Sequence, residues 1–304
     1  MDGTVTSDPP QAAAAAARPV VLPLRHGAAA APAELGESPV WDPERGELIW
    51  VDVDRGLVHR RSPGRADRTL DAGQPVGCAV PRAGGGLALA VRDGFALADP
   101  GGEPRLVQPV ERERPDTRMN DGACDRRGRL WAGTMSLRGD TRSAALYRLD
   151  PDLTVRRVLP GLSVSNGIGW SPDGDTLYHV DTPRRRIDAY DFDEAAGAIA
   201  GRRAVIPVAP DLGSPDGLAV DSEGGVWLAL WGGGAVVRFS PEGVLEERID
   251  VPARNVTSCC FGDAGLSTLY VTTAARGDGS EPLAGAVFAC RPGVSGLPAT
   301  PFAG

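Results

Sequence analysis

The stretch GIGWSPDGDTLYHVDTPRRRIDAYDFD, residues 167–193, decides the fold. It opens with a short apolar run, turns at Ser-Pro-Asp-Gly, continues in a second apolar run, and returns in a third after a polar gap. Short apolar runs separated by such turns are typical of antiparallel β-strands. No helical period is sustained along the chain. The stretch therefore predicts consecutive strands linked as hairpins.

The same pattern recurs five more times. The other copies begin at residues 38, 77, 122, 217 and 258, with SPVWDPERGELIW, GCAVPRAGGGLALAV, GACDRRGRLWAGTM, GLAVDSEGGVWLALW and SCCFGDAGLSTLYV. The mean period is about 44 residues, as expected for propeller blades of four short strands. Six copies predict an all-β fold, a six-bladed β-propeller spanning residues 19–304. We expect PVVLPL (residues 19–24) to pair into the last blade and close the ring. We expect residues 1–18 to form a disordered tail.

The composition excludes several functions. The net charge is −8, which argues against a nucleic-acid partner, and no apolar run approaches the roughly 20 residues of a membrane span. All 32 basic residues are Arg, which excludes a Schiff-base Lys, a P-loop Lys and a Ser-Lys dyad. The three His are scattered. The five Cys are odd in number and form no CxxC motif, so we expect reduced, buried thiols and a cytoplasmic location. Residues 1–18 lack the features of a secretory signal.

Oxygen-bearing side chains precede the first strand in four of the six copies. They are Glu37, Asn120 with Asp121, Asn166 and Asp216. We expect them to ring one mouth of the central channel, where carboxylate and amide oxygens suit Ca²⁺, Mg²⁺ or Mn²⁺. Each alone resembles an ordinary turn residue, and Pro-Asp-Gly at 215–217 is interpreted as a tight turn before a strand. Their recurrence at one place favours a metal site. By contrast, Asp42, Asp125, Asp173 and Asp221 follow the first strands and are interpreted as turn formers.

These residues resemble the SMP-30/gluconolactonase/regucalcin-like family. The motifs are AELGESPVWD, RMNDGACDRRGRLWAGTM, SNGIGWSPDGDTLY, SPDGLAVD and TSCCFG, in family order from about residue 33 onward. The resemblance implies a metal-dependent lactonase that opens sugar lactones, typically aldonolactones, to hydroxy acids. It implies one divalent cation, Ca²⁺ first with Zn²⁺, Mg²⁺ or Mn²⁺ as alternatives, held by Glu37, Asn166 and Asp216. Asp216 would also be the general base for a metal-activated water. Arg118, Asn120 and the adjacent Asp121 would bind substrate.

Two departures from the family pattern concern the substrate. The sequence SLRGD follows AGTM, which places Arg138 where relatives often carry an acidic residue, and WGGG with Trp231 stands where some relatives carry YNGG. We expect Arg138 to overhang the mouth and to pair with the carboxylate of an anionic lactone.

Two other functions stay open at this point. One is a phosphotriesterase-like hydrolase on the same metal site, and the other is a non-catalytic calcium-binding or interaction propeller. The expected partner is a small-molecule lactone. No nucleic acid, membrane or obligate protein partner is expected.

Overall fold

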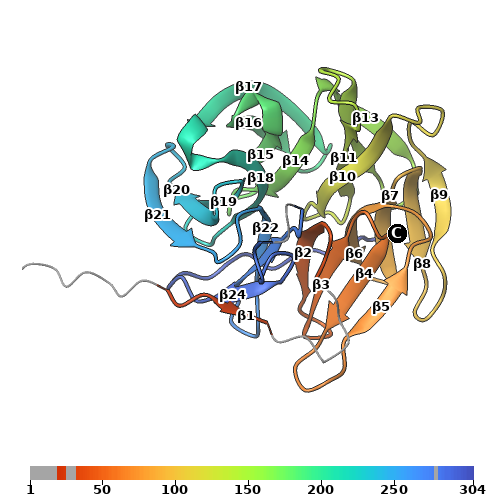
Figure 1. The fold of residues 1–304 in the computed structure, drawn as a ribbon. Helices are drawn as coiled ribbons and strands as arrows, with labels where there is room; N and C mark the ends of the chain where they lie inside the picture. The colour runs from red at the N-terminus through yellow and green to blue at the C-terminus, as the bar shows by residue number, and fades with distance from the viewer. Residues whose placement is uncertain (1–18, 25–31, 277–279) are drawn as a thin grey trace, which may run out of the picture.

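Six four-stranded antiparallel sheets, arranged in a ring around a central axis, make up the computed structural model of residues 19–24, 32–276 and 280–304 (Figure 1). Each sheet is one blade, and its first strand along the chain lies innermost in blades one to five. Two short 3-10 helices, η1 (Thr182–Arg184) and η2 (Pro210–Leu212), lie in connections. The predicted six-bladed β-propeller is confirmed.

The strands are as follows, each blade from the axis outward. The first three blades hold β2 (Gly36–Asp42), β3 (Glu47–Asp52), β4 (Leu57–Arg61) and β5 (Arg68–Asp71); β6 (Val76–Pro81), β7 (Leu87–Val91), β8 (Gly94–Ala98) and β9 (Arg105–Pro109); β10 (Thr117–Cys124), β11 (Leu130–Ser136), β12 (Ala144–Leu149) and β13 (Val155–Leu162). The last three hold β14 (Ser165–Trp170), β15 (Thr176–Asp181), β16 (Arg186–Asp193) and β17 (Ala198–Pro207); β18 (Ser214–Val220), β19 (Val226–Trp231), β20 (Ala235–Phe239) and β21 (Leu245–Asp250); β22 (Val256–Gly262), β23 (Thr268–Thr273), β24 (Phe288–Cys290) and β1 (Leu22–Pro23).

The N-terminal strand closes the ring as predicted. β1 pairs antiparallel with β24, with Leu22 opposite Ala289 and Pro23 opposite Phe288. The sixth blade is therefore built from both ends of the described chain, which covers an edge that would otherwise be exposed. The expected disordered tail, residues 1–18, lies outside the described residues. No helix among the described residues is long and apolar enough to cross a membrane.

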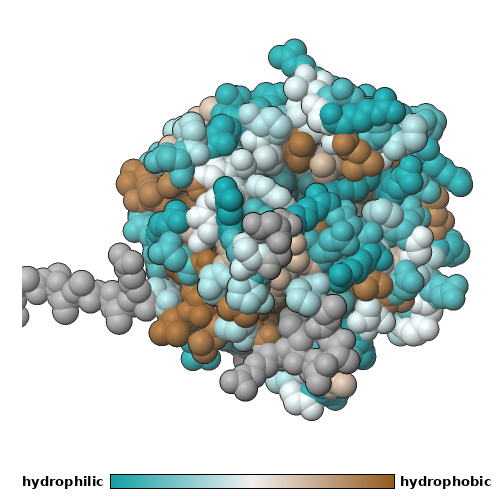
Figure 2. All heavy atoms as spheres, viewed as in Figure 1, coloured by the Kyte–Doolittle hydropathy of each residue, from teal (hydrophilic) through white to brown (hydrophobic). Residues whose placement is uncertain are grey.

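The core lies between neighbouring blades. Six apolar clusters of described residues fill these interfaces. Between blades four and five, for example, Val180 and Ile187 pack with Leu228 and Val237, each fully buried. Burial of such a side chain contributes about 1.5–3 kcal/mol, so the blades are held chiefly by their shared faces. On the face shown in Figure 2, hydrophobic residues form small separate areas among hydrophilic ones.

The four aspartates interpreted as turn formers have that role. Asp125 Oδ1 accepts the backbone N–H groups of Arg127 and Arg129 at 2.9 and 3.1 Å, and its Oδ2 accepts the indole N–H of Trp131 at 2.8 Å. Asp221 accepts the corresponding bonds in blade five, from residues 223, 225 and 227. Asp42 and Asp173 likewise accept backbone N–H groups two residues ahead. All four turns lie at the opposite end of the innermost strands from the candidate site.

The cysteines agree with their expected role as unpaired thiols. All five are free; Cys78, Cys259 and Cys290 are buried, and Cys124 and Cys260 are half-buried.

Candidate metal and substrate site

Five of the candidate site residues, Glu37, Asn120, Asp121, Asn166 and Asp216, sit at irregularities of innermost strands. The pairing register shifts between Glu37 and Val40 in β2, between Met119 and Gly122 in β10, between Ser165 and Ile168 in β14, and between Pro215 and Leu218 in β18. These four shifts coincide with Glu37, with Asn120 and Asp121, with Asn166 and with Asp216. A β-bulge re-aims a side chain that would otherwise follow the strand alternation. The bulges therefore redirect carboxylate or amide side chains in four of the six inner strands, and β6 and β22 carry register shifts without such a side chain.

The interpretation of Pro-Asp-Gly at 215–217 as a tight turn is wrong. These residues lie inside β18, and Asn166–Gly167 lies inside β14. The glycines are needed because the inner strands converge on the axis. A Cβ on Gly167 would lie 2.7 Å from the carbonyl oxygen of Asp216, and a Cβ on Gly217 would lie 2.1 Å from Ser258 Oγ. Asp-Gly and Asn-Gly serve close packing here rather than a turn.

Glu37, Asn166 and Asp216 come together at this end of the channel, and each is only 6% exposed. Asn166 Nδ2 donates hydrogen bonds to Asp216 Oδ1 and, at 3.2 Å, to Thr182 Oγ1. Asn166 Oδ1 is buried and has no hydrogen-bond partner among the described residues. Glu37 Oε2 accepts the backbone N–H of Ser38 at 2.9 Å. The three side chains therefore bring together two carboxylates and an unpartnered amide oxygen.

The electrostatics of this group call for a positive charge. Burial raises the pKa of Glu37 well above its ordinary value, and the nearby charges of Asp216 and Asp121 raise it further. The pKa of Asp216 is also raised well above its ordinary value, by burial first and then by Asp121. Among the described residues no group of three or more His, Cys, Asp or Glu could hold a metal, so a cation held here would also need the amide oxygen of Asn166. An all-oxygen set fits a hard divalent cation.

Arg118 and Asn120 form the polar side of the site. Arg118 Nη1 donates to the Met119 carbonyl at 2.9 Å and to Asn120 Oδ1 at 2.7 Å, and Asn120 Nδ2 donates to the Ser165 carbonyl at 2.9 Å. Burial lowers the pKa of Arg118 to about 10, although neighbouring acids oppose that shift. Its other N–H groups make no hydrogen bond within the described part of the chain. Asn120 therefore holds Arg118, and Arg118 keeps donors free for a ligand.

The other two candidates, Asp121 and Arg138, lie beside this group rather than within it. Asp121 accepts hydrogen bonds from Ser38 Oγ at 2.6 Å and from the backbone N–H of Gly122 at 2.8 Å, and it lines a cavity at the opposite end of the channel. Arg138 is exposed in the connection between β11 and β12, where its backbone N–H donates to Ser136 Oγ at 3.2 Å. The structure thus brings together Glu37, Asn166, Asp216 and Arg118, and places Arg138 in an exposed loop at the same end of blade three as Arg118.

A groove of about 830 Å³ opens at the same end as the candidate ligands. Its lining includes Ser214, two residues before Asp216, together with Arg185, Trp231, Arg254 and Arg276. Arg276 also pairs with Asp54 of blade one, and both charges act on Arg118. The groove is therefore lined by three arginines and by Ser214, close in the chain to Asp216, while the carboxylates themselves lie outside its lining.

Sequence reasoning missed two contributors to the site. Ser38 has a backbone φ of 44° and touches both Glu37 and Asp121. Its position directly after Glu37 in GESP was the available signal. Thr182 begins η1 and accepts a hydrogen bond from Asn166, a contact that depends on strand register and left no motif.

A model of the SMP-30/gluconolactonase/LRE-like region matches residues 35–275. The chain belongs to this family. The resemblance drawn from the motifs is therefore confirmed, and the matched region spans the innermost strands that carry Glu37, Asn166 and Asp216.

Relatives of the family cover nearly all of the chain. Regucalcin of Danio rerio is 37% identical over 281 residues, which is 89% of this chain and 95% of the relative. A putative sugar lactone lactonase of Bacillus subtilis is 35% identical over 282 residues, covering 90% and 96%. The crystal structure of a calcium-binding protein, regucalcin, from Agrobacterium tumefaciens superimposes with a TM-score of 0.85 at 29% identity, covering 90% of this chain and 95% of that one.

Proposed function

We propose that this protein is a lactonase that depends on a divalent cation and opens sugar lactones to hydroxy acids. The observation that carries the proposal is the burial of Glu37 and Asp216 beside the unpartnered Oδ1 of Asn166. Two carboxylates with raised pKa values are costly to bury without a compensating positive charge. The relative named as a sugar lactone lactonase supports the substrate class.

Glu37, Asn166 and Asp216 would hold one cation, with Ca²⁺ as the first choice and Mg²⁺, Mn²⁺ or Zn²⁺ as alternatives. Their oxygens are hard ligands, and the orphaned amide oxygen fits that role. When bound, such a cation supplies positive charge for the lactone carbonyl oxygen and lowers the pKa of water beside it.

Asp216 is the proposed general base. One of its oxygens accepts the hydrogen bond from Asn166, which leaves the other free to accept a proton. Water adds to the lactone carbonyl carbon while Asp216 takes its proton; the ring C–O bond then breaks, and the proton passes to the leaving ring oxygen.

Arg118 is the proposed substrate anchor. It is 6% exposed, and Asn120 fixes it through a 2.7 Å hydrogen bond. Its free N–H donors can bond to the ring hydroxyls of a sugar lactone and hold the ester over Asp216. This mechanism requires no nucleophilic side chain, which agrees with the absence of Lys from the chain.

The test is a hydrolysis assay on the full chain after chelation and verified metal removal, with Ca²⁺, Mg²⁺, Mn²⁺ or Zn²⁺ restored separately. The panel contains neutral and anionic aldonolactones and a phosphotriester. We expect lactone hydrolysis only with cation present. The same assay is applied to Asp216→Asn, and Asp152→Asn, at an exposed turn, is its matched control. Full activity without metal would contradict the proposal. A preference for the phosphotriester would favour the phosphotriesterase-like alternative, and cation binding without hydrolysis of any substrate would favour the non-catalytic one.

A further inference from the structure

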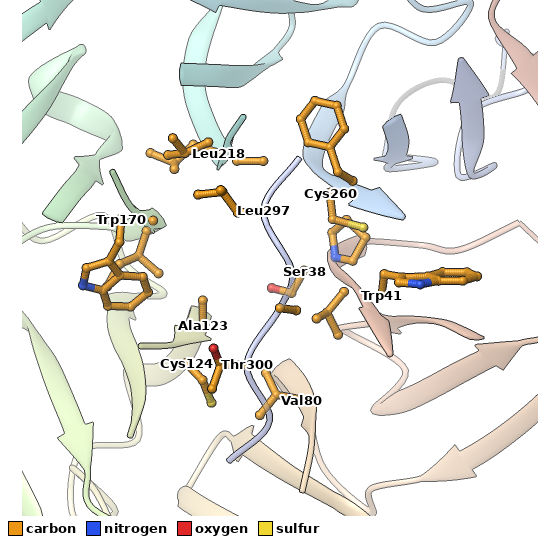
Figure 3. A pocket seen from close by; sticks show the side chains of 18 of the residues that line it. Ser38, Trp41, Val80, Ala123, Cys124, Trp170, Leu218, Cys260, Leu297 and Thr300 are labelled. Atoms are coloured by element: carbon orange, nitrogen blue, oxygen red, sulfur yellow. The ribbon is translucent and has the colours of Figure 1, made fainter. Parts of the chain in front are cut away.

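The central channel widens into a cavity of about 540 Å³ at the end opposite the candidate ligands. Its walls are the innermost strands and the C-terminal segment 297–300, which runs across it (Figure 3). The wall side chains are largely apolar and include Trp41, Val80, Trp170, Leu218 and Leu297. The volume falls within the range of small-molecule sites, about 300–1,000 Å³.

A carboxylate lies at the inner end of this apolar space. Asp121 is 7% exposed, and both of its hydrogen bonds, from Ser38 Oγ and from the Gly122 N–H, go to Oδ1. Asp121 Oδ2 accepts no hydrogen bond within the described part of the chain. The hydroxyl of Ser258, which also lines the cavity, likewise has no partner among the described residues. The lining of the cavity therefore includes one residue with an unpartnered carboxylate oxygen and one with an unpartnered hydroxyl.

Asp121 lies close enough to the candidate cation ligands for its charge to act on Glu37 and Asp216, but it faces a different space. Glu37, Asn166 and Asp216 do not line this cavity, whereas Asp121 and Ser38 do. Ser38 connects the two sides, since its N–H donates to Glu37 and its O–H donates to Asp121. Ser38 holds this position with a φ of 44°, in the left-handed region that a residue with a side chain rarely adopts. Such strain persists only where the surrounding structure enforces it.

We propose that this cavity is a second ligand site, which takes a small molecule with a compact apolar body and one hydrogen-bond-donating head group, an ammonium or a hydroxyl. The head group donates to Asp121 Oδ2, and the body fills the space between Trp41, Trp170 and Leu297. The apolar walls contribute about 25 cal/mol for each Å² of ligand surface removed from water. A carboxylate head does not fit beside Asp121, because it would face a like charge, and the other charged residue of the lining, Arg126, already donates to the carbonyls of Pro172 and Asp173. The proposal goes beyond lactone hydrolysis and does not depend on it.

The test is calorimetric titration of the full, Ca²⁺-saturated chain with three probes that share one body. They are cyclohexylmethylamine, cyclohexylmethanol and cyclohexanecarboxylate. We expect a Kd below about 1 mM for the amine, weaker binding for the alcohol, and no binding of the carboxylate. Equal binding of all three probes, or no binding of the amine and the alcohol, would overturn the proposal. Tighter binding of the alcohol than of the amine would support the same site with a hydroxyl-bearing ligand.

Two variants locate the binding. Asp121→Asn should weaken binding of the amine by about 10- to 150-fold, the loss expected for a charge-assisted hydrogen bond. Binding of the alcohol should be nearly unchanged. Ala123→Leu fills part of the cavity and should weaken both probes without altering Asp121; Ala66→Leu, in the exposed connection between β4 and β5, is its control. Unchanged binding by Ala123→Leu would place the probes elsewhere and refute the site, even where Asp121→Asn fails to fold.

Discussion

Replacing Glu37 by Gln should remove most of the stability that this protein gains from a divalent cation. Glu37 is 6% exposed, and burial together with Asp216 and Asp121 raises its pKa. Glutamine has the same shape and can still accept the Ser38 N–H, but it carries no charge. Without cation, Glu37→Gln should therefore be more stable than the native chain. With cation, the native chain should gain stability that the variant lacks.

The magnitudes follow from burial and from binding linkage. Removing a buried charge that Arg118 only partly offsets should stabilise the cation-free protein by about 1–3 kcal/mol. At a cation concentration of about 100 Kd, the native chain gains about 2.7 kcal/mol, or about 5 °C in Tm for a chain of this size. If the variant binds about 100-fold more weakly, the same concentration adds only about 0.4 kcal/mol, or about 1 °C.

The assay is thermal unfolding followed by circular dichroism, with and without Ca²⁺, at pH 7.5. Glu34→Gln is the matched control, because the Glu34 side chain is 54% exposed at the entrance to the same blade. Equal Ca²⁺ shifts for the native chain and Glu37→Gln would refute the assignment of Glu37 as a ligand. A cation-free variant less stable than the native chain would refute the account of its electrostatics.

Four further expectations can be checked separately. Asp216→Asn should lower kcat by about 10²-fold or more with the fold intact, and near-normal kcat would leave Asp216 without a catalytic role. The cation-free chain should become more stable as pH falls from 8 toward 5. The pKa values of Glu37 and Asp216 lie near 4.5 and 3.8 in the unfolded chain and are raised in the folded one, so the folded state binds protons more tightly. A Tm that does not change with pH in the presence of a chelator would contradict this. Arg254→Ala should reduce kcat/KM on anionic lactones more than Arg138→Ala does, since only Arg254 lines the groove, and the reverse order would favour Arg138. Gly167→Ala should destabilise by about 1–3 kcal/mol in urea unfolding, because its Cβ would meet the Asp216 carbonyl, and an unchanged midpoint would refute the close-packing argument.

The fold could be predicted because each blade repeats the same short sequence pattern. Apolar runs and Asp-Gly turns are local signals, and Asp125 and Asp221 occupy equivalent turns with the same bond to a Trp six residues on. The closing strand was also predictable, since residues 19–24 had no other blade to join. Glu37, Asn166 and Asp216 were found because the repeat aligns positions that lie far apart in the chain.

The sequence could not predict how the inner strands are paired in register and how they approach one another at the axis. Asn-Gly and Asp-Gly favour turns locally, but convergence on the axis places Asn166 and Asp216 in strands at bulges. The direction of Asp121 depends on the same bulge in β10, which sends it to the far cavity rather than to the mouth. Arg138 lies in a loop whose course no repeat constrains, and its expected place over the mouth was not supported by any contact with the groove.

The location of the cation tests the central claim most directly. Crystals of the full chain soaked with Mn²⁺ would reveal the ion through its anomalous scattering, and a Ca²⁺ soak would give the ligand distances. The account predicts one ion bound by oxygens of Glu37, Asn166 and Asp216, with Ca²⁺ at about 2.3–2.6 Å from each. An ion bound elsewhere, or no ion at saturating Mn²⁺ and Ca²⁺, would contradict it.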